Sequence, residues 1–168
     1  MIRDVTLRDG LQLTGKVLPA ERKVALVREL LALGVPSIEV GSLARPDLVQ
    51  SMANTLEVIE ALTPDELAHC WVWVATPRHV ARARAAGAVN FQYCLSASDA
   101  HNKANIGRST EDSVAALPAA VENAAGGRIQ LCIATSFTCP FEGEIPPRTS
   151  ARDRGRPAHG RHRGHRRV

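Results

Sequence analysis

Short apolar runs and longer apolar stripes alternate along the chain. The runs have the pattern of buried strands and begin near Ile2, Ser37, Cys70, Asn90 and Arg128. Each is short and bounded by polar or turn residues. No hairpin signal joins one run to the next, so we expect about five strands that pair in parallel.

Four stripes between these runs have the spacing of amphipathic helices. They cover residues 19–34, 46–62, 77–86 and the segment that begins at Ser109. Pro19 and Gly34 are typical end residues of a helix. The stripe between them predicts these inward side chains: Val24, Val27, Leu30, Leu31 and Leu33. Ser109 opens a capping-box-like Ser-Thr-Glu-Asp, and Pro118 predicts a kink or a restart of the helix.

The alternation of strand and helix favours parallel βα units. This pattern fits a doubly wound sheet as well as a (β/α)8 barrel. The repeat of about 30 residues per unit matches a TIM barrel of ~250 residues divided by eight. We therefore expect an α/β fold over residues 1–147, namely an incomplete TIM (β/α)8 barrel with roughly the first five strands and four helices.

The composition predicts a cytoplasmic globular protein. The chain has 168 residues, 45% of them hydrophobic, which is enough for one domain with a sizeable core. No apolar run approaches the ~20 residues that span a bilayer. Arg3, Asp4, Arg8 and Asp9 interrupt any signal-peptide pattern. We expect no membrane partner.

Residues 148–168 differ sharply from the rest. They carry eight arginines and one aspartate among Gly and His, so the net charge of +4 leaves residues 1–147 mildly acidic. With almost no aliphatic content, this tail is expected to be disordered. A shifted reading frame in GC-rich coding DNA would give the same mixture. A basic arm for nucleic acid and a metal site at His159, His162 and His165 are the alternatives, and we expect neither, since ligands need a scaffold.

Cysteine usage gives one candidate. Cys70, Cys94 and Cys132 lie in or beside apolar runs and no Cys-x-x-Cys pair occurs. This predicts buried free thiols rather than disulfides or a zinc site. Cys139 lies in a turn-rich segment and is the cysteine to test for function.

The stretch from Asp4 to Gln12 carries the clearest chemistry. A short apolar strand should end there in a charged turn, with Arg8 and Asp9 at its carboxyl end. Arg offers a rigid fork of donors to an oxyanion, and a carboxylate is a hard ligand for Mg²⁺. Together they suit a substrate that develops negative charge beside a metal, although an isolated Arg-Asp-Gly also fits a solvated turn.

Five segments in order resemble one family, the 3-hydroxy-3-methylglutaryl-CoA (HMG-CoA) lyases. They are Arg8–Gln12, Ile38–Ser42, Met52–Thr55, Ser96–Ile106 and Cys139–Gly143. The resemblance implies a retro-Claisen cleavage of HMG-CoA into acetoacetate and acetyl-CoA, with Mg²⁺ or Mn²⁺. It implies an acyl-CoA substrate and, for the intact family, a homodimer. The alternatives are a related barrel enzyme, of the isopropylmalate or homocitrate synthase or 4-hydroxy-2-oxovalerate aldolase type, and a non-enzymatic fragment with a basic arm.

The resemblance also assigns roles. Asp9 matches the family's carboxylate metal ligand, and Arg8 matches its enolate-stabilising catalytic cation. Glu39 matches a second catalytic-site carboxylate that supports the surroundings of the metal. Three residues match substrate-binding polar positions: Gln12, Ser42 and Asn105. His101 maps onto no family role and is expected to be a surface histidine.

Other family residues have no counterpart in the sequence. A His-x-His pair and a later Asn, which complete the family's metal site, are absent, as is the catalytic cysteine on a glycine-rich loop. One carboxylate would leave most of the coordination sites of a divalent cation to water. We therefore predict that this polypeptide does not catalyse the reaction by itself.

Overall fold

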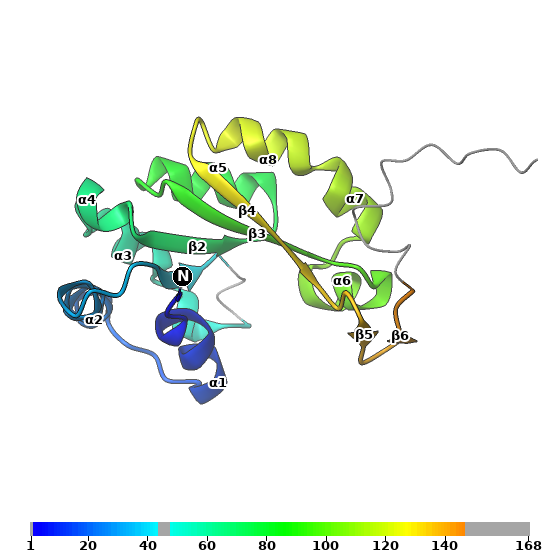
Figure 1. The fold of residues 1–168 in the computed structure, drawn as a ribbon, viewed down its shortest axis with the longest axis horizontal. Helices are drawn as coiled ribbons and strands as arrows, with labels where there is room; N and C mark the ends of the chain where they lie inside the picture. The colour runs from blue at the N-terminus through cyan, green and yellow to red at the C-terminus, as the bar shows by residue number, and fades with distance from the viewer. Residues whose placement is uncertain (1, 44–47, 147–168) are drawn as a thin grey trace, which may run out of the picture.

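A four-stranded parallel sheet forms the centre of the computed structural model, which describes residues 2–43 and 48–146. The strands are β1 (Ile38–Ser42), β2 (Cys70–Val74), β3 (Asn90–Ser96) and β4 (Arg128–Ala134), and they lie side by side in chain order (Figure 1). Helices connect successive strands. The predicted α/β class with parallel βα units is confirmed.

Within the described residues, helices precede the first strand and separate the four strands of the sheet. In chain order they are α1 (Leu11–Thr14), α2 (Ala20–Ala32), α3 (Thr55–Glu60), α4 (Pro64–Leu67), α5 (Pro77–Ala85), α6 (Asp99–Ile106), α7 (Thr110–Ala115) and α8 (Leu117–Asn123). Helices α5 and α8 pack together over one face of the sheet (Figure 1). Ser109 caps α7 by accepting a hydrogen bond from the Asp112 amide. The predicted restart is confirmed, because α7 ends at Ala115 and α8 begins at Leu117 with Pro118 in its first turn.

The predicted first strand is wrong in extent. Only Asp4 forms a parallel bridge, to Ile38, and residues Thr6–Gly10 form a single π-helical turn, η1, that leads into α1. The carboxylate of Asp4 accepts hydrogen bonds from the backbone amide and the hydroxyl of Thr6, at 3.0 and 3.1 Å. This local turn ends the extended chain before a ladder can form.

Two helix predictions need correction. The stripe expected over 46–62 is divided, within the described residues, into a 3-10 turn at Gln50–Met52 (η2) and the short α3. The last member of the α2 stripe, Leu33, is 81% exposed because α2 ends at Ala32. Helix α6 was not predicted.

A short antiparallel hairpin follows the sheet, although no hairpin signal was found. Its strands are β5 (Thr138–Cys139) and β6 (Gly143–Glu144). Gly143 adopts a φ of +73°, which a residue with a side chain rarely does. Cys139 lies in β5 and is buried, whereas its turn-rich segment suggested an open turn. The predictions for residues 148–168 lie outside the described residues.

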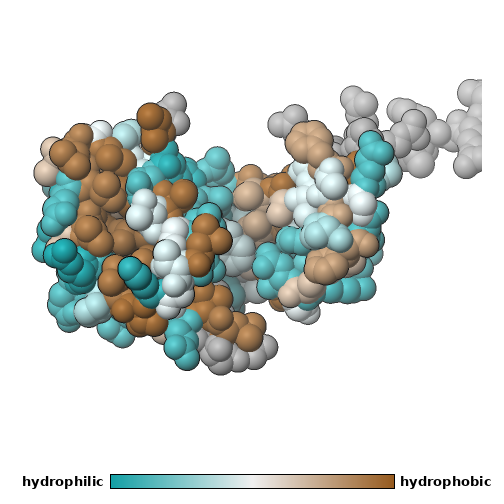
Figure 2. All heavy atoms as spheres, turned by 90° about the horizontal axis from the view of Figure 1, so that it is seen from below, coloured by the Kyte–Doolittle hydropathy of each residue, from teal (hydrophilic) through white to brown (hydrophobic). Residues whose placement is uncertain are grey.

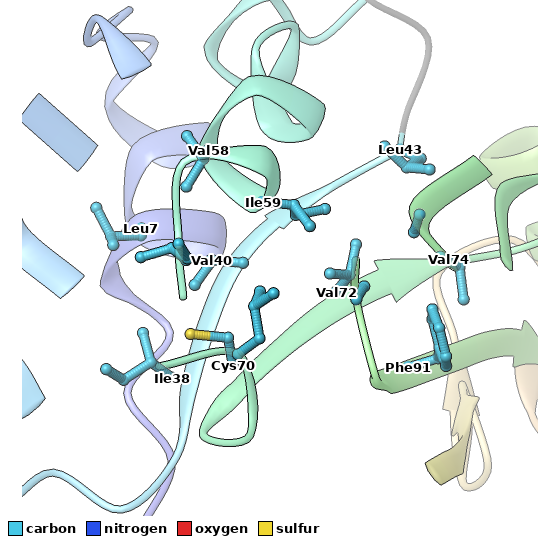
Figure 3. Packing of buried hydrophobic residues seen from close by; sticks show 14 of the residues in the cluster. Leu7, Ile38, Val40, Leu43, Val58, Ile59, Cys70, Val72, Val74 and Phe91 are labelled. Atoms are coloured by element: carbon cyan, nitrogen blue, oxygen red, sulfur yellow. The ribbon is translucent and has the colours of Figure 1, made fainter. Parts of the chain in front are cut away.

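The largest hydrophobic cluster lies between the sheet and its helices. Figure 3 shows Val40 and Val72 of the strands on the side of Val58 and Ile59 of α3, and Val74 beside Phe91 of β3. Apolar residues also reach the surface, where Figure 2 shows brown atoms among the teal ones. Large exposed examples are Leu13, Leu33, Leu48, Phe137 and Phe141. Within the described residues, no helix is long and apolar enough to cross a membrane.

Candidate active site

A cavity of about 630 Å³ opens at the carboxyl ends of the strands. In parallel α/β folds this edge of the sheet carries the ligand site. The wall combines side chains of η1, α1, all four strands and α6. The polar and aromatic members are Arg8, Gln12, Ser42, Trp73, Thr76, His79, Gln92, Cys94, Lys103, Asn105 and Cys132.

Four of the six predicted site residues meet at this cavity. Arg8, Gln12, Ser42 and Asn105 all line it, although they come from separate segments of the chain. Glu39 is buried and contacts Arg8. Asp9 stays outside the wall, with 52% of its side chain exposed. The arrangement therefore groups the predicted substrate positions and leaves the predicted metal ligand outside the cavity wall.

An irregularity in β1 turns Glu39 and Ser42 to the same side. Glu39 pairs with Trp71, but Gly41 pairs with Val72 and Ser42 with Trp73, so one extra residue lies in β1. In a regular strand, residues three apart face opposite sides. The extra residue of the β-bulge shifts the alternation by one position, so the side chains of Glu39 and Ser42 both point to the cavity side of the sheet.

Arg8 is held by two carboxylates. Its Nε donates to Oε2 of Glu39 at 2.7 Å, and its Nη1 donates to Oδ1 of Asp9 at 3.1 Å. A second guanidinium, that of Arg3, lies 3.7 Å from Glu39 and donates to Gln92 at 3.0 Å. Arg3 also stacks 4.0 Å over the Trp71 ring. These contacts fix the orientation of Arg8 at the cavity wall.

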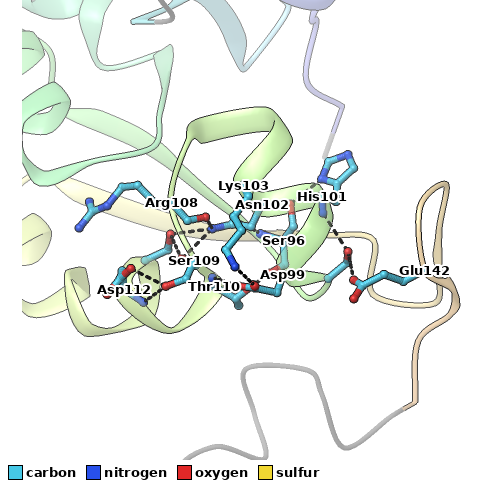
Figure 4. A network of polar contacts seen from close by, with 12 residues as sticks. Ser96, Asp99, His101, Asn102, Lys103, Arg108, Ser109, Thr110, Asp112 and Glu142 are labelled. Atoms are coloured by element: carbon cyan, nitrogen blue, oxygen red, sulfur yellow. Dashed lines mark hydrogen bonds and ion pairs between the residues drawn. The ribbon is translucent and has the colours of Figure 1, made fainter.

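A buried amide positions α6, which carries Asn105. Oδ1 of Asn102 accepts from the Ser96 amide at 2.8 Å, and its Nδ2 donates to the carbonyl oxygens of Arg108 and Ser109, at 2.9 Å each (Figure 4). Its Nδ2 also donates to the Ser113 hydroxyl at 2.8 Å, so this buried amide has four polar partners. Asn102 thus joins the end of β3 to the start of α7, and this role was missed in the sequence because it depends on tertiary contacts.

Two polar atoms at the cavity lack a partner within the described residues. They are the hydroxyl of Ser42, which is only 2% exposed as a residue, and Nδ1 of His79. Burial lowers the pKa of His79, and the nearby Arg82 and Arg78 lower it further. Unpaired buried polar atoms cost free energy, so a ligand that bonded to them would gain that amount.

His101 and one cysteine differ from their predictions. His101 is half-buried rather than a surface residue, and its Nδ1 lies 2.7 Å from the Ser96 hydroxyl. All four cysteines are free as predicted, but Cys132 is only partly buried and lines the cavity beside Cys94. The Cys139 thiol donates to Ser98 at 2.9 Å, and Ser98 donates to Glu142. Cys139 is thus part of a structural contact away from the cavity wall.

The described residues do not form a metal site by themselves. Among them, no three His, Cys, Asp or Glu side chains group closely enough to hold an ion. The one predicted ligand, Asp9, already pairs with Arg8. Among the described residues, this donor set does not fit the six or more oxygen ligands of a hard divalent cation.

Comparison with known proteins places the chain. The HMGL-like family matches residues 1–153. The chain belongs to this family. Among curated proteins, it is 34% identical to the (R)-citramalyl-CoA lyase of Chloroflexus aurantiacus, over 87% of this chain and 50% of the relative. It is 26% identical to a hydroxymethylglutaryl-CoA lyase of Bacillus subtilis, over 86% and 49%.

Solved HMGL-like structures confirm the barrel. An HMG-CoA lyase from Acinetobacter baumannii, in complex with coenzyme A and 3-methylmalate, superposes with a TM-score of 0.79 and 31% identity, over 88% of this chain and 48% of the other. The HMG-CoA lyase from Bacillus subtilis gives 0.82 and 25%, over 92% and 52%. The chain spans about half the length of the HMGL-like relatives it matches. Its four parallel strands therefore correspond to part of a TIM barrel.

Proposed function

We propose that the chain supplies the acyl-binding part of a carbon-carbon lyase that acts on a tertiary 3-hydroxyacyl-CoA by retro-Claisen cleavage. The observation that carries this proposal is the meeting of Arg8, Gln12, Ser42 and Asn105 at one cavity. The unpaired Ser42 hydroxyl supports it, since a bound carboxylate or carbonyl would satisfy that donor.

The chemistry assigns a task to each group. Cleavage removes the proton from a tertiary hydroxyl, breaks the adjacent carbon-carbon bond and leaves an enolate on the thioester. Arg8 would stabilise the developing oxyanion, because a fixed guanidinium costs no reorganisation during the reaction. Glu39 would keep Arg8 in place. Gln12, Ser42 and Asn105 would orient the acyl group through hydrogen bonds.

The names of the relatives suggest two candidate substrates of this class. HMG-CoA is the substrate in the names of most of the relatives, whereas the 34% identical relative is a citramalyl-CoA lyase. The two molecules share a tertiary alcohol, a methyl group and a carboxylate. Cleavage of HMG-CoA would release acetoacetate, and cleavage of citramalyl-CoA would release pyruvate, each together with acetyl-CoA. The ketoacid product therefore distinguishes them.

Turnover should require residues that this sequence lacks. The HMGL-like family is generally dependent on a divalent metal, and Asp9 is the one ligand that we propose from this chain, with Mg²⁺ or Mn²⁺ as the ion. We derive no step through that ion, because the described donor set does not complete a site. The chain is expected to bind the CoA ester without cleaving it.

A binding and turnover assay tests the proposal. Purified chain is titrated calorimetrically with HMG-CoA and with citramalyl-CoA, and acetyl-CoA, acetoacetate and pyruvate are measured after incubation. We expect binding of at least one ester and no product. Arg8→Gln should weaken binding about tenfold or more, the loss expected for one charge-assisted hydrogen bond. The matched control Arg28→Gln removes an exposed ion pair with Glu66 and should bind normally. No binding, or an equal loss in both variants, would refute the proposal.

The reading-frame hypothesis has its own test. The DNA after the Pro147 codon is translated in the other two frames. A strand with His-x-His followed by a Gly-Gly-Cys-like loop would support a frameshift, and its absence from both frames would end that explanation. If the sequence is found, the repaired protein should release acetoacetate or pyruvate. A repaired protein that instead condensed acetyl-CoA with a 2-oxoacid would point to the synthase alternative.

A further inference from the structure

Two thiols face each other across the floor of the cavity. Cys94 of β3 and Cys132 of β4 are direct partners in the parallel register, so their side chains point to the same side of the sheet. Both line the cavity, and each thiol shifts the pKa of the other. Neighbouring strands lie about 4.8 Å apart, which is within the ~4.4–6.8 Å between Cα atoms that a disulfide allows.

The two thiols differ in their surroundings. Cys94 is 5% exposed, whereas Cys132 is more accessible from the cavity. The Cys94 thiol lowers the pKa of Cys132; burial opposes this shift, and the Gln92 amide supports it. Of the charged neighbours, Glu39 raises the pKa of Cys132 and Arg8 lowers it. The Cys132 thiol and burial raise the pKa of Cys94. The pair thus combines a reachable thiolate with a shielded thiol at its side.

We propose that Cys94 and Cys132 form a dithiol site that is oxidised to an intramolecular disulfide by low-molecular-weight disulfides entering the cavity. The Cys132 thiolate attacks one sulfur of the reagent, forming a mixed disulfide and releasing one thiolate. Cys94 then gives its proton to that thiolate and attacks the Cys132 sulfur, which releases the second. The two cysteines lose two electrons, and the reagent is reduced to one thiol and one thiolate, which takes up the proton that Cys132 had released to water.

The expected consequence is local. A covalent bond between β3 and β4 would fix the two sulfur atoms close to Gln92 and Arg8, and so alter the wall on which the predicted substrate positions lie. The inference needs only the register and the cavity. It does not depend on the proposed lyase function and can fail or succeed without it.

Peptide mapping of the complete chain tests the site. The native protein is treated with hydroxyethyl disulfide, a small neutral reagent, quenched with acid and alkylated. Tryptic digestion and mass spectrometry should then find the peptide of Cys94 linked to that of Cys132, with both hydrogens lost, and dithiothreitol should restore them. Cys94→Ser should stop at a mixed disulfide on Cys132. Cys132→Ser should slow consumption of the reagent about tenfold, because the more reactive thiolate is gone.

The other two cysteines are matched controls. Cys70 and Cys139 are also buried and free, and burial raises the pKa of Cys70 to about 12. Cys70→Ser and Cys139→Ser should leave the crosslink unchanged. Denaturant should abolish the preference for the Cys94 and Cys132 pair. Oxidation of Cys70 or Cys139 at the same rate, or wild-type protein that stops at the mixed disulfide, would overturn the proposal. If a variant does not fold, the peptide map of the wild-type protein is sufficient to test the proposal.

Discussion

At the residue scale, the pair of Glu39 and Arg8 is the contact on which the site geometry depends most. Glu39 is 2% exposed, and its two oxygens face the guanidinium groups of Arg8 and Arg3. A carboxylate can be buried this deeply only when nearby positive groups offset its lost hydration. The ion pair links two segments far apart in the sequence. It therefore both stabilises the fold and orients the Arg8 side chain.

Glu39→Gln should therefore destabilise the protein measurably. The amide keeps the size of the side chain but removes its charge, and Arg8 loses its shortest ion pair. We expect a loss of about 2–3 kcal/mol in the free energy of unfolding, measured by urea denaturation. Glu66→Gln is the matched control, because Glu66 pairs with the half-exposed Arg28 and glutamine preserves its capping box. That variant should lose less than about 1 kcal/mol. Equal losses would show that Glu39 has no special role.

At the scale of elements, the bulge in β1 depends on a close approach to α3. The irregular register directs Gly41 toward the helices, where a Cβ atom would lie 2.4 Å from Oγ1 and 2.8 Å from Cγ2 of Thr55. Thr55 is fully buried, and its hydroxyl donates to the Met52 carbonyl at 2.8 Å. Only glycine fits here, because the space is occupied and not because the backbone is strained.

Gly41→Ala should separate β1 from α3. Overpacking a well-packed core costs about 1–3 kcal/mol, occasionally more, and we expect a loss at the upper end in urea denaturation. Thr55→Ala removes the two nearest atoms, so the double variant should be more stable than the sum of the two single losses implies. Additive losses would contradict the contact. Gly15→Ala is not a suitable control, since its φ of +64° makes alanine strained for another reason.

The helices and strands also show which features a sequence can predict and which it cannot. The restart at Pro118 and the cap at Ser109 were predicted, because both depend on residues within one turn. The bulge was not, since period-two reasoning assumes a regular strand. Gln12, Ser42 and Asn105 were found through family resemblance rather than through periodicity. The pairing of Cys94 with Cys132 requires the register between two strands, which no local pattern contains.

At the scale of the whole molecule, the sheet is open. The outer edge of β4 has no strand partner within the described residues, and on the other side β1 has only the bridge to Asp4. Related structures are about twice as long, so further strands cover these edges in a closed barrel. An open edge presents unpaired backbone donors and acceptors to any other chain.

The polypeptide alone should therefore self-associate through β4. In sedimentation velocity over a concentration series, we expect species larger than a monomer. Leu131, on β4, is 40% exposed, and Leu131→Lys should shift the distribution toward monomer because a charged edge opposes strand pairing. Leu33→Lys provides a matched control, since Leu33 is 81% exposed at the end of α2, away from β4. It should leave the distribution unchanged. A wild-type chain that stays monomeric throughout, or equal dissociation by both substitutions, would show that the association does not use this edge.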